Sequence, residues 1–195
     1  PAGPATVYRD TIRLAVEAER LGFDSFWVAQ HHGGHQNGYL PSPLVLLAAL
    51  AEHTSTIRLG TAVIVAPLEH PLRLAEDATV LDELTGGRLE LGVGAGADPK
   101  ASARFGVSHE ERHQRCFEVL DELLSLLGTD ELVPRTGTLR ERLWLASGTR
   151  SGADFASQRG IGLLSGRKSS GPDGPCAGDT EAAAHIGHYL DTART

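Results

Sequence analysis

Three histidines stand close together in the first part of the chain: His31, His32 and His35. Imidazole changes its charge near neutral pH, so a histidine beside a reacting group can give and take protons. The same side chains could bind a metal. However, no Asp, Glu or Cys lies beside them and HHxxH is not a standard zinc spacing, so we predict no metal site. From these residues alone, a histidine-rich surface loop is the simpler interpretation.

Glycines recur at every second position of another segment, at Gly92, Gly94 and Gly96. They follow a predicted strand and would let the backbone approach a ligand closely. The run from Gly92 to Ala97 also imitates a dinucleotide-binding fingerprint. The Rossmann interpretation ranks low, because Asp98-Pro99 stands where its helix should begin and no acid-terminated strand follows about 20 residues later.

The turn from Gly148 to Gly152 (GTRSG) could bind an anion. Free N–H groups at a helix start, two hydroxyls and an arginine together suit a phosphate. Capping of the helix by Ser151 would explain the same residues, and the two interpretations are compatible. Arg112 and Arg115, near the start of a long helix, are candidates for a second phosphate contact.

Hydrophobic periodicity and turn residues indicate which elements position these groups. We predict strands over residues 24–30, 57–66, 88–93, 143–146 and 161–164, and helices over residues 6–21, 43–53, 71–84, 110–127, 151–158 and 180–190. Residues 31–39 and 168–178 are predicted loops. We expect the helix at 43–53 to be buried nearly all round, and the helix at 6–21 to present one apolar face made of Val7, Leu14, Ala18 and Leu21.

Strands that alternate with helices are typical of βαβ units and a parallel sheet. Right-handed crossovers then place all strand C-termini on one side. His31, at the end of a predicted strand, belongs to that rim. Cys116 is a predicted core residue. Trp27 and Trp144 are predicted to lie in the core or, at most, in the wall of a pocket. The charged groups of the helix at 71–84 are expected to form structural ion pairs, one of them with Arg88.

Composition limits the class of protein. The 195 residues are 41% hydrophobic and 22% charged, with a formal net charge of -7. An acidic chain is a poor match for nucleic acid, and no apolar run approaches the roughly 20 residues of a membrane span. No secretory signal is recognisable, and two cysteines, Cys116 and Cys176, suit a reducing compartment. We therefore expect a cytoplasmic protein with neither a nucleic-acid nor a membrane partner.

Three stretches resemble one known family. Residues 70–88 read HPLRLAEDATVLDELTGGR, with LGTAVIV before them and LELGVGAG after them. This run closely resembles the bacterial luciferase family of flavin-dependent monooxygenases. Upstream, LGFDSFWVAQHHGG resembles that family's second strand and histidine pair. Downstream, LWLASGTRSGADFASQRG resembles its fifth strand and flavin-phosphate loop. Order and spacing agree from residue 10 to about residue 165.

The resemblance implies a TIM-type (β/α) barrel that binds reduced FMN at the strand C-termini. Alternation along a strand keeps His31 and His32 from both facing the flavin but does not choose between them, whereas the resemblance selects His31 as the catalytic residue. It also implies a non-proline cis peptide, Ala62–Val63, under the flavin ring. The full set of candidate flavin-binding residues is Ala62, Val63, Gly94, Ala95, Gly96, Arg112, Arg115, Ser147, Gly148, Thr149, Ser151 and Gly152.

The chain departs from the family at two positions near the predicted site, Gln30 and Gly94. Gln30 precedes the histidine pair where luciferases carry a carboxylate, which questions the proton relay. Gly94 stands where luciferase itself has a reactive cysteine, so that chemistry does not transfer.

The implied function is oxidation of a small organic substrate by O2 and reduced FMN, through a flavin peroxide. A separate flavin reductase and a homodimer formed through the early helices are the implied partners. Two alternatives remain open. One is an oxidoreductase of the same fold that uses the deazaflavin F420 and transfers hydride without oxygen. The other is a non-catalytic flavin-binding or partner subunit with a shortened barrel.

The length predicts an incomplete barrel. A closed eightfold barrel takes about 250 residues, and the first predicted helix has no strand before it. We expect residues 1–195 to form a single, partial barrel domain that lacks the first strand and the late strands. The chain starts at Pro1 and contains no methionine, so we expect it to belong to a longer gene product.

Overall fold

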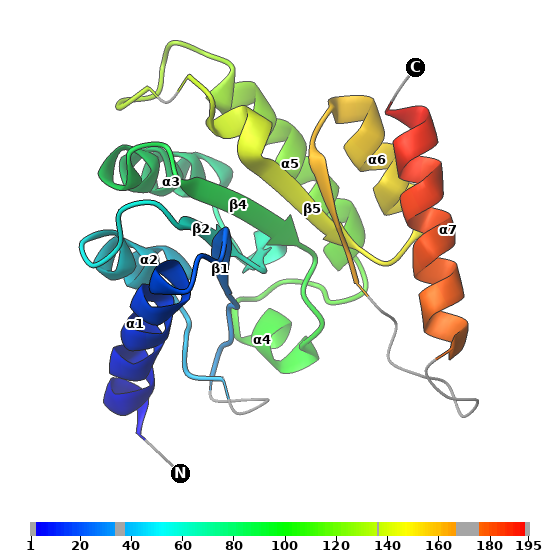
Figure 1. The fold of residues 1–195 in the computed structure, drawn as a ribbon. Coiled ribbons are helices and arrows are strands. Elements are labelled where there is room, and N and C mark those ends of the chain that lie inside the picture. The colour runs from blue at the N-terminus through cyan, green and yellow to red at the C-terminus, as the bar shows by residue number, and fades with distance from the viewer. Residues whose placement is uncertain (1–2, 34–37, 136, 167–175, 194–195) are drawn as a thin grey trace.

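The computed structural model describes residues 3–33, 38–135, 137–166 and 176–193, in which strands alternate with helices (Figure 1). The strands are β1 (Ser25–Val28), β2 (Arg58–Thr61), β3 (Ile64–Val65), β4 (Leu89–Gly94), β5 (Leu143–Ser147) and β6 (Gly162–Ser165). The helices are α1 (Pro4–Arg20), α2 (Pro43–Ala51), α3 (Pro71–Thr85), α4 (Pro99–Arg104), α5 (Arg112–Leu127), α6 (Arg150–Arg159) and α7 (Cys176–Thr192). Two short 3₁₀ helices, Ala66–Leu68 and Leu139–Arg142, precede α3 and β5.

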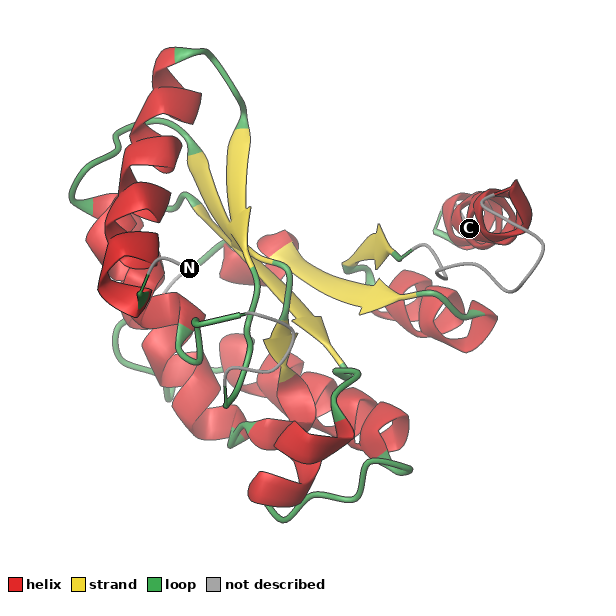
Figure 2. Ribbon diagram, turned by 90° about the horizontal axis from the view of Figure 1, so that it is seen from below, coloured by secondary structure: helices red, strands yellow, loops and turns green. Residues whose placement is uncertain are grey.

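The strands form one parallel sheet in the order β1-β2-β4-β5-β6, and β3 pairs with β4. Each strand of this path lies beside the one before it, so the chain winds in one direction. A doubly wound sheet would instead reverse its strand order at a switch point. Figure 2 shows the sheet curled, with helices along its outer side. The predicted α/β class is confirmed as a curled half-barrel of the TIM type.

The outer face of the sheet carries the core. Leu59, Leu89, Leu91, Leu143 and Leu145 alternate along β2, β4 and β5, and each is at most 1% exposed. The register aligns Leu59 with Leu89 and Leu91 with Leu143, so they form one apolar surface. Helices α2, α3 and α5 cover that surface with their own buried side chains, which include Leu47, Leu50, Leu74, Ala78, Leu81, Leu120 and Leu123. Cys116 belongs to the same core, as predicted, and burial raises the pKa of its thiol to about 12.

The concave face carries large side chains packed over glycines. The rings of Trp27 on β1 and Trp144 on β5 meet edge to face, with centroids 6.3 Å apart, although β2 and β4 separate their strands. The Trp144 Nε1–H donates to Glu90 Oε2 at 2.6 Å. A side chain at Gly60 would overlap the Trp27 indole, and one at Gly162 would overlap Trp144. These contacts hold neighbouring strands in the curled arrangement.

Most predicted elements are present, with several corrections. The strand predicted over 57–66 is split into β2 and β3, and α4 was not predicted. On α1 the expected apolar face is only partly correct: Ala18 packs against the core, but Leu14 and Leu21 are 62% and 59% exposed, and Ala15 is the fully buried residue. Helix α2 is not buried all round, because Val45 is 73% exposed.

Other sequence predictions fall partly beyond the described residues. His35 lies there, as does the predicted loop at 168–178 up to residue 175, after which α7 begins. Among the described residues, no helix is both long and apolar enough to cross a membrane.

The charged residues of α3 do form ion pairs. Arg73 contacts Glu76 and Asp77 on the exposed side of the helix. Asp82 pairs with Arg142, which precedes β5. Arg88 does not pair with any of these carboxylates, contrary to our expectation. Its guanidinium instead donates to Thr54 Oγ1 and to the carbonyl oxygens of Ala51, Thr54, Ile57 and Thr85, and so fixes the loop between α2 and β2.

Candidate active site

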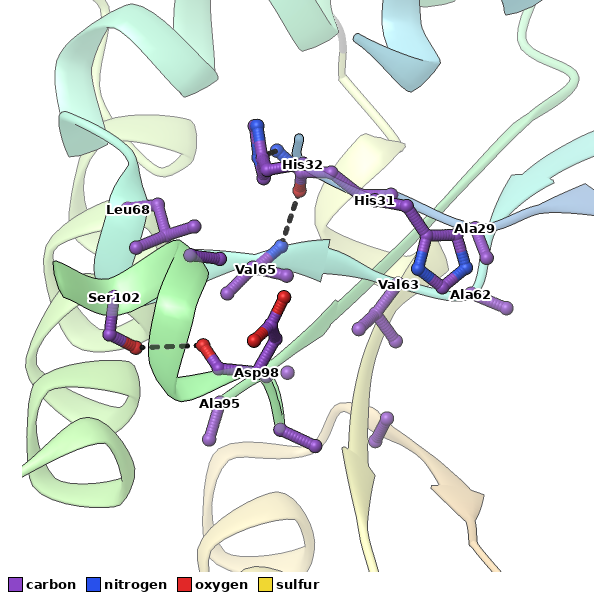
Figure 3. Close-up of a pocket in the computed structure, with 16 residues that line it drawn as sticks. Ala29, His31, His32, Ala62, Val63, Val65, Leu68, Ala95, Asp98 and Ser102 are labelled. Carbon is purple, nitrogen blue, oxygen red and sulfur yellow. Dashed lines mark hydrogen bonds between the residues drawn. The ribbon is translucent and has the colours of Figure 1, made fainter. Parts of the chain in front are cut away.

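A cavity of about 320 Å³ opens beyond the C-terminal ends of β1, β3, β4 and β5 (Figure 3). In a parallel barrel this rim carries the active site. Six of the predicted site residues line it: His31, Ala62, Val63, Gly94, Ala95 and Gly96. Most of the remaining wall is apolar, and its polar groups come from Gln30, His32, Asp98 and Ser102.

His31 is held at the rim by its backbone. Its N–H donates to the carbonyl of Leu40 at 2.8 Å, which joins the segment after β1 to the approach to α2. Gly38 packs against the imidazole so closely that a Cβ there would overlap the ring. In Figure 3 the rings of His31 and His32 point in different directions from the chain, although both residues line the cavity. Among the described residues, nothing forms a hydrogen bond with the ring of His31.

His32 is tied to a buried amide instead. Its Nε2 lies 2.9 Å from Gln30 Nε2, and Gln30 is only 7% exposed. Gln30 Nε2 also contacts Glu69 Oε1 at 3.0 Å and Pro41 O at 3.3 Å, while Gln30 Oε1 accepts from Val65 N at 2.6 Å. Burial lowers the pKa of His32, and the charges of Glu69 and Asp98 oppose that effect.

The floor of the cavity is backbone with small side chains. The Ala62–Val63 peptide is cis, as the resemblance implied. A Cβ at Gly94 would come within 2.9 Å of Val63 Cγ2, and one at Gly92 would overlap the Thr61 carbonyl oxygen. Gly96 has a φ of +72°, a conformation that favours glycine. The main effect of these glycines is therefore to let β2, β3 and the residues between them pack closely against β4 and the loop after it. The shape of the cavity follows from this close packing.

The turn after β5 is lined with hydroxyls. Ser147 Oγ lies 3.0 Å from Thr149 Oγ1, which in turn lies 3.1 Å from Ser151 Oγ. The N-cap of α6 is Thr149, which accepts from Gly152 N at 3.2 Å, so our prediction of Ser151 as the cap is wrong. A Cβ at Gly152 would overlap the Ser147 side chain. Glycine at position 152 therefore lets the first turn of α6 lie directly against Ser147, with three hydroxyl groups around it.

Helices α5 and α6 run parallel, which brings their first turns together. The rings of Phe117 and Phe155 stack at 4.3 Å, and Arg159 pairs with Asp121 one turn further along both helices. Because the partners are 38 residues apart in both contacts, the start of α5 lies at the level of the start of α6. Parallel helices with adjacent N-termini concentrate positive potential at that end.

The two candidate arginines of α5 differ in their surroundings. Arg112 donates from Nη1 to the carbonyl of His109 at 2.8 Å, and its Nε is shielded from solvent without a hydrogen-bond partner among the described residues. Arg115 pairs with Glu118 at 3.3 Å, and both side chains are close to half exposed. Only Arg112 therefore has a buried donor left to offer to a ligand.

Two wall residues escaped the sequence analysis, Asp98 and Ser102 on the short helix α4. Asp98 caps α4 by accepting from Lys100 N at 2.9 Å. Figure 3 shows its carboxylate pointing towards the cavity. Ser102 Oγ lies 3.1 Å from His109 Nδ1. The signal was available, because an Asp followed by Pro is a typical helix start; we interpreted it only as evidence against a Rossmann helix.

Comparison with known families gives a consistent match. Residues 1–174 match the family described as luciferase-like monooxygenase. An uncharacterised protein of Sinorhizobium fredii is 33% identical, over 97% of this chain and 66% of its own length. The 4-hydroxyprotoasukamycin monooxygenase of Streptomyces nodosus is 40% identical, over 67% of this chain and 34% of its own length. The oxygenase component of the flavin-dependent trigonelline monooxygenase of Acinetobacter baylyi is 29% identical, over 80% of this chain and 48% of its own length. The chain thus spans about a third to two thirds of these relatives.

Solved structures agree on the fold. A monooxygenase of Streptomyces bottropensis superposes with a TM-score of 0.87 at 25% identity, over 98% of this chain and 61% of its own. The oxygenating constituent of a 3,6-diketocamphane monooxygenase of Pseudomonas putida, in complex with FMN, superposes with a TM-score of 0.79 at 21% identity. The match covers 98% of this chain and 58% of its own. A coenzyme F420-dependent reductase of Methanopyrus kandleri superposes with a TM-score of 0.68 at 21% identity. The match covers 95% of this chain and 60% of its own. The last two likenesses concern the fold alone.

Proposed function

Because this chain belongs to the luciferase-like monooxygenase family, we propose that it uses reduced FMN and O2 to oxidise a small organic substrate, with His31 as the catalytic residue. One observation carries the proposal: a histidine-bearing cavity and a turn suited to phosphate lie at the C-terminal ends of adjacent strands. The cavity reaches Ala146 on β5, and the hydroxyl-lined turn begins at the next residue, Ser147.

The residues at this rim fit the phosphate of FMN. Thr149 and Ser151 offer hydroxyls, the start of α6 offers backbone N–H groups, and Arg112 offers a buried Nε that nothing else in the described chain uses. An anion is favoured where free N–H groups and the positive ends of helices converge. We therefore assign the phosphate to the turn Ser147–Gly152 together with Arg112. Arg115, paired at the surface, serves as the control.

The cavity itself would take the flavin ring and the substrate. Its wall of alanines, glycines, valines and a leucine would exclude water from the reacting groups. Bound reduced FMN would supply the electrons for the reaction with O2. His31 contributes a ring whose Nδ1 and Nε2 form no hydrogen bond with the described residues, so that either nitrogen can exchange a proton within the cavity.

The proposal extends to the whole protein. We propose that residues 1–195 belong to one partial barrel domain, because the buried side chains of the described residues form a cluster that joins the sheet to its outer helices. A separate flavin reductase is the proposed partner, since one relative is named as an oxygenase component. A homodimer and a cytoplasmic location remain predictions from the sequence.

The test is a flavin titration of the full chain. Oxidised FMN, reduced FMN and riboflavin are each titrated, and absorbance is followed after the reduced complex is mixed with O2. A charge-assisted hydrogen bond contributes about 1.5–3 kcal/mol, so Arg112→Ala should weaken FMN binding by roughly 10- to 100-fold and leave riboflavin binding unchanged. Arg115→Ala should change neither. His31→Ala should slow substrate oxidation by about 100-fold or more without loss of FMN affinity.

Three results would contradict the proposal. Binding of oxidised FMN without any reaction with O2 would indicate a carrier or partner subunit. Binding of F420 with substrate reduction and no oxygen consumption would indicate the hydride-transferring alternative. An equal loss of FMN and riboflavin affinity in Arg112→Ala would remove Arg112 from the phosphate site.

A further inference from the structure

The side-chain amide of Gln30 has only one orientation that its neighbours allow. The Val65 N–H, 2.6 Å from Oε1, can only donate a hydrogen bond. The Pro41 carbonyl and the Glu69 carboxylate, at 3.3 Å and 3.0 Å from Nε2, can only accept one. Exchanging the amide oxygen and nitrogen would set donor against donor and acceptor against acceptor. The contacts therefore fix Nε2 on the side of Glu69 and His32.

This orientation determines the protonation of His32. Gln30 Nε2 is a donor, and it lies 2.9 Å from His32 Nε2. The amide has two hydrogens, and its two nearer neighbours, His32 Nε2 at 2.9 Å and Glu69 Oε1 at 3.0 Å, are placed to take them, while Pro41 O is more distant at 3.3 Å. Because an amide nitrogen cannot accept a hydrogen bond, a proton on His32 Nε2 would face another donor, so this nitrogen accepts and carries no proton. We propose that Gln30 is a positioning residue that holds His32 as the neutral Nδ1–H tautomer and leaves His31 as the one member of the pair that is free to exchange protons. The second half of this statement rests on the proposed function, whereas the first does not.

The surroundings of His32 match that assignment. The rings of His32 and Phe105 meet edge to face, with centroids 4.7 Å apart. The charged and titratable groups around it are Glu69 after the 3₁₀ helix, Asp98 at the start of α4, and His31. Burial lowers the pKa of His32, and His31 acts in the same direction against the two carboxylates. The neutral ring of His32, already hydrogen-bonded to Gln30, fills its part of the cavity wall and keeps its Nδ1–H as a donor. The ring of His31, which has no such hydrogen bond, can change its charge.

The residue type at position 30 is decisive. A glutamate there could still accept from Val65 N with one oxygen, but its other oxygen would face Glu69 and His32 Nε2. An acceptor beside Nε2, with added negative charge, favours a proton on that nitrogen. Gln30 therefore separates the roles of two adjacent histidines through a single amide group.

The first test uses the full chain without flavin. Long-range proton–nitrogen correlation spectra of the protein labelled with ¹⁵N-histidine distinguish the two neutral tautomers, and His32→Gln identifies the His32 signal by its loss. We expect an unprotonated Nε2 at neutral pH and protonation only below the ordinary pKa of 6.5. An Nε2–H tautomer, or a charged ring at neutral pH, would overturn the proposal without any bearing on flavin chemistry.

The second test is Gln30→Glu, with Gln114→Glu on the exposed side of α5 as the matched control. We expect the His32 signal of Gln30→Glu to titrate above 6.5 and to show a proton on Nε2, with no change in the control. The pH dependence of substrate oxidation should gain a second ionisation in the same range. An unaltered His32 titration in folded Gln30→Glu would overturn the inference, and the wild-type spectrum decides the tautomer even if that variant does not fold.

Discussion

Asp82 and Arg142 form an ion pair that is nearly closed to solvent, with side chains only 4% and 12% exposed. Their contact is bidentate, at 2.7 Å and 3.0 Å, and Arg142 also donates to Leu89 O and Thr138 Oγ1. The hydrogen bond to Asp82 raises the pKa of Arg142. The pair joins α3 to the segment that leads into β5, and so fixes the strand from which the turn Ser147–Gly152 extends.

We predict that Asp82→Asn lowers the free energy of unfolding by about 3 kcal/mol. Removing one partner of a buried pair leaves the other charge without compensation, which is the costly case. The measurement is urea unfolding at neutral pH. Asp77→Asn is the matched control, because it removes an exposed pair on the same helix, where we expect less than about 1 kcal/mol. Similar losses in the two variants would contradict the argument.

Single residues show where sequence reasoning ends. His31 and the turn at 148–152 became candidates because the residues before and after them resemble a family. Arg142 was not, because it lies 60 residues from Asp82 and no local pattern joins them. The cap of α6 was misplaced from Thr149 to Ser151, since both are good capping residues and only the backbone conformation separates them.

One carboxylate attaches α1 to the start of β2. Glu19 Oε1 accepts hydrogen bonds from the backbone N–H groups of Ser55, Thr56 and Ile57, at 2.8 Å, 2.6 Å and 2.9 Å. These bonds favour the ionised form, and they lower the pKa of Glu19 from 4.5 to about 2. Because β1 follows α1, this contact sets the position of the strand that carries the histidine pair.

We predict that Glu19→Gln reduces the pH dependence of stability in acid. A carboxylate with a lowered pKa in the folded state stabilises the fold above its unfolded value of 4.5, and that contribution is lost as the pH falls towards about 2. The wild type should therefore lose its advantage over the variant within this range. Urea unfolding at several acidic pH values measures it, with Glu122→Gln, an exposed carboxylate on α5, as control. A constant difference between wild type and variant would be inconsistent with this role.

Elements were predicted best where one pattern dominates. Helix α3 is bounded by Pro71 and Gly86, and both ends agree with the sequence within a residue. Helix α4 was missed because six residues are too few for a periodicity. The buried face of α1 was misplaced because apolar residues lie on more than one side of it, and only its contact with the rest of the fold decides which side is covered.

The alternation of strands and helices predicted the class of the whole fold, but not its curvature. Nothing in the local pattern shows that β1 and β5 approach each other across the concave face. That depends on Trp27 and Trp144, each seated over a glycine of the adjacent strand, and on the register that aligns Trp27 with Gly60 and Trp144 with Gly162.

We predict that Gly60→Ala destabilises the molecule by about 1–3 kcal/mol, because the added methyl group would overlap the Trp27 indole and force it out of its contact with Trp144. Near-ultraviolet circular dichroism and tryptophan fluorescence should change together with the urea midpoint, since the two indoles report directly on the curl. Gly187→Ala on α7 is the control: outside its own stretch of helix, no atom of the described residues lies within 4 Å of the new Cβ, and alanine favours a helix by up to about 1 kcal/mol. If Gly60→Ala kept both the stability and the spectra of the wild type, the packing of the two indoles on glycines would not be what curls the sheet. The curl also brings the C-terminal ends of the strands together around the cavity, so their arrangement would then need another explanation.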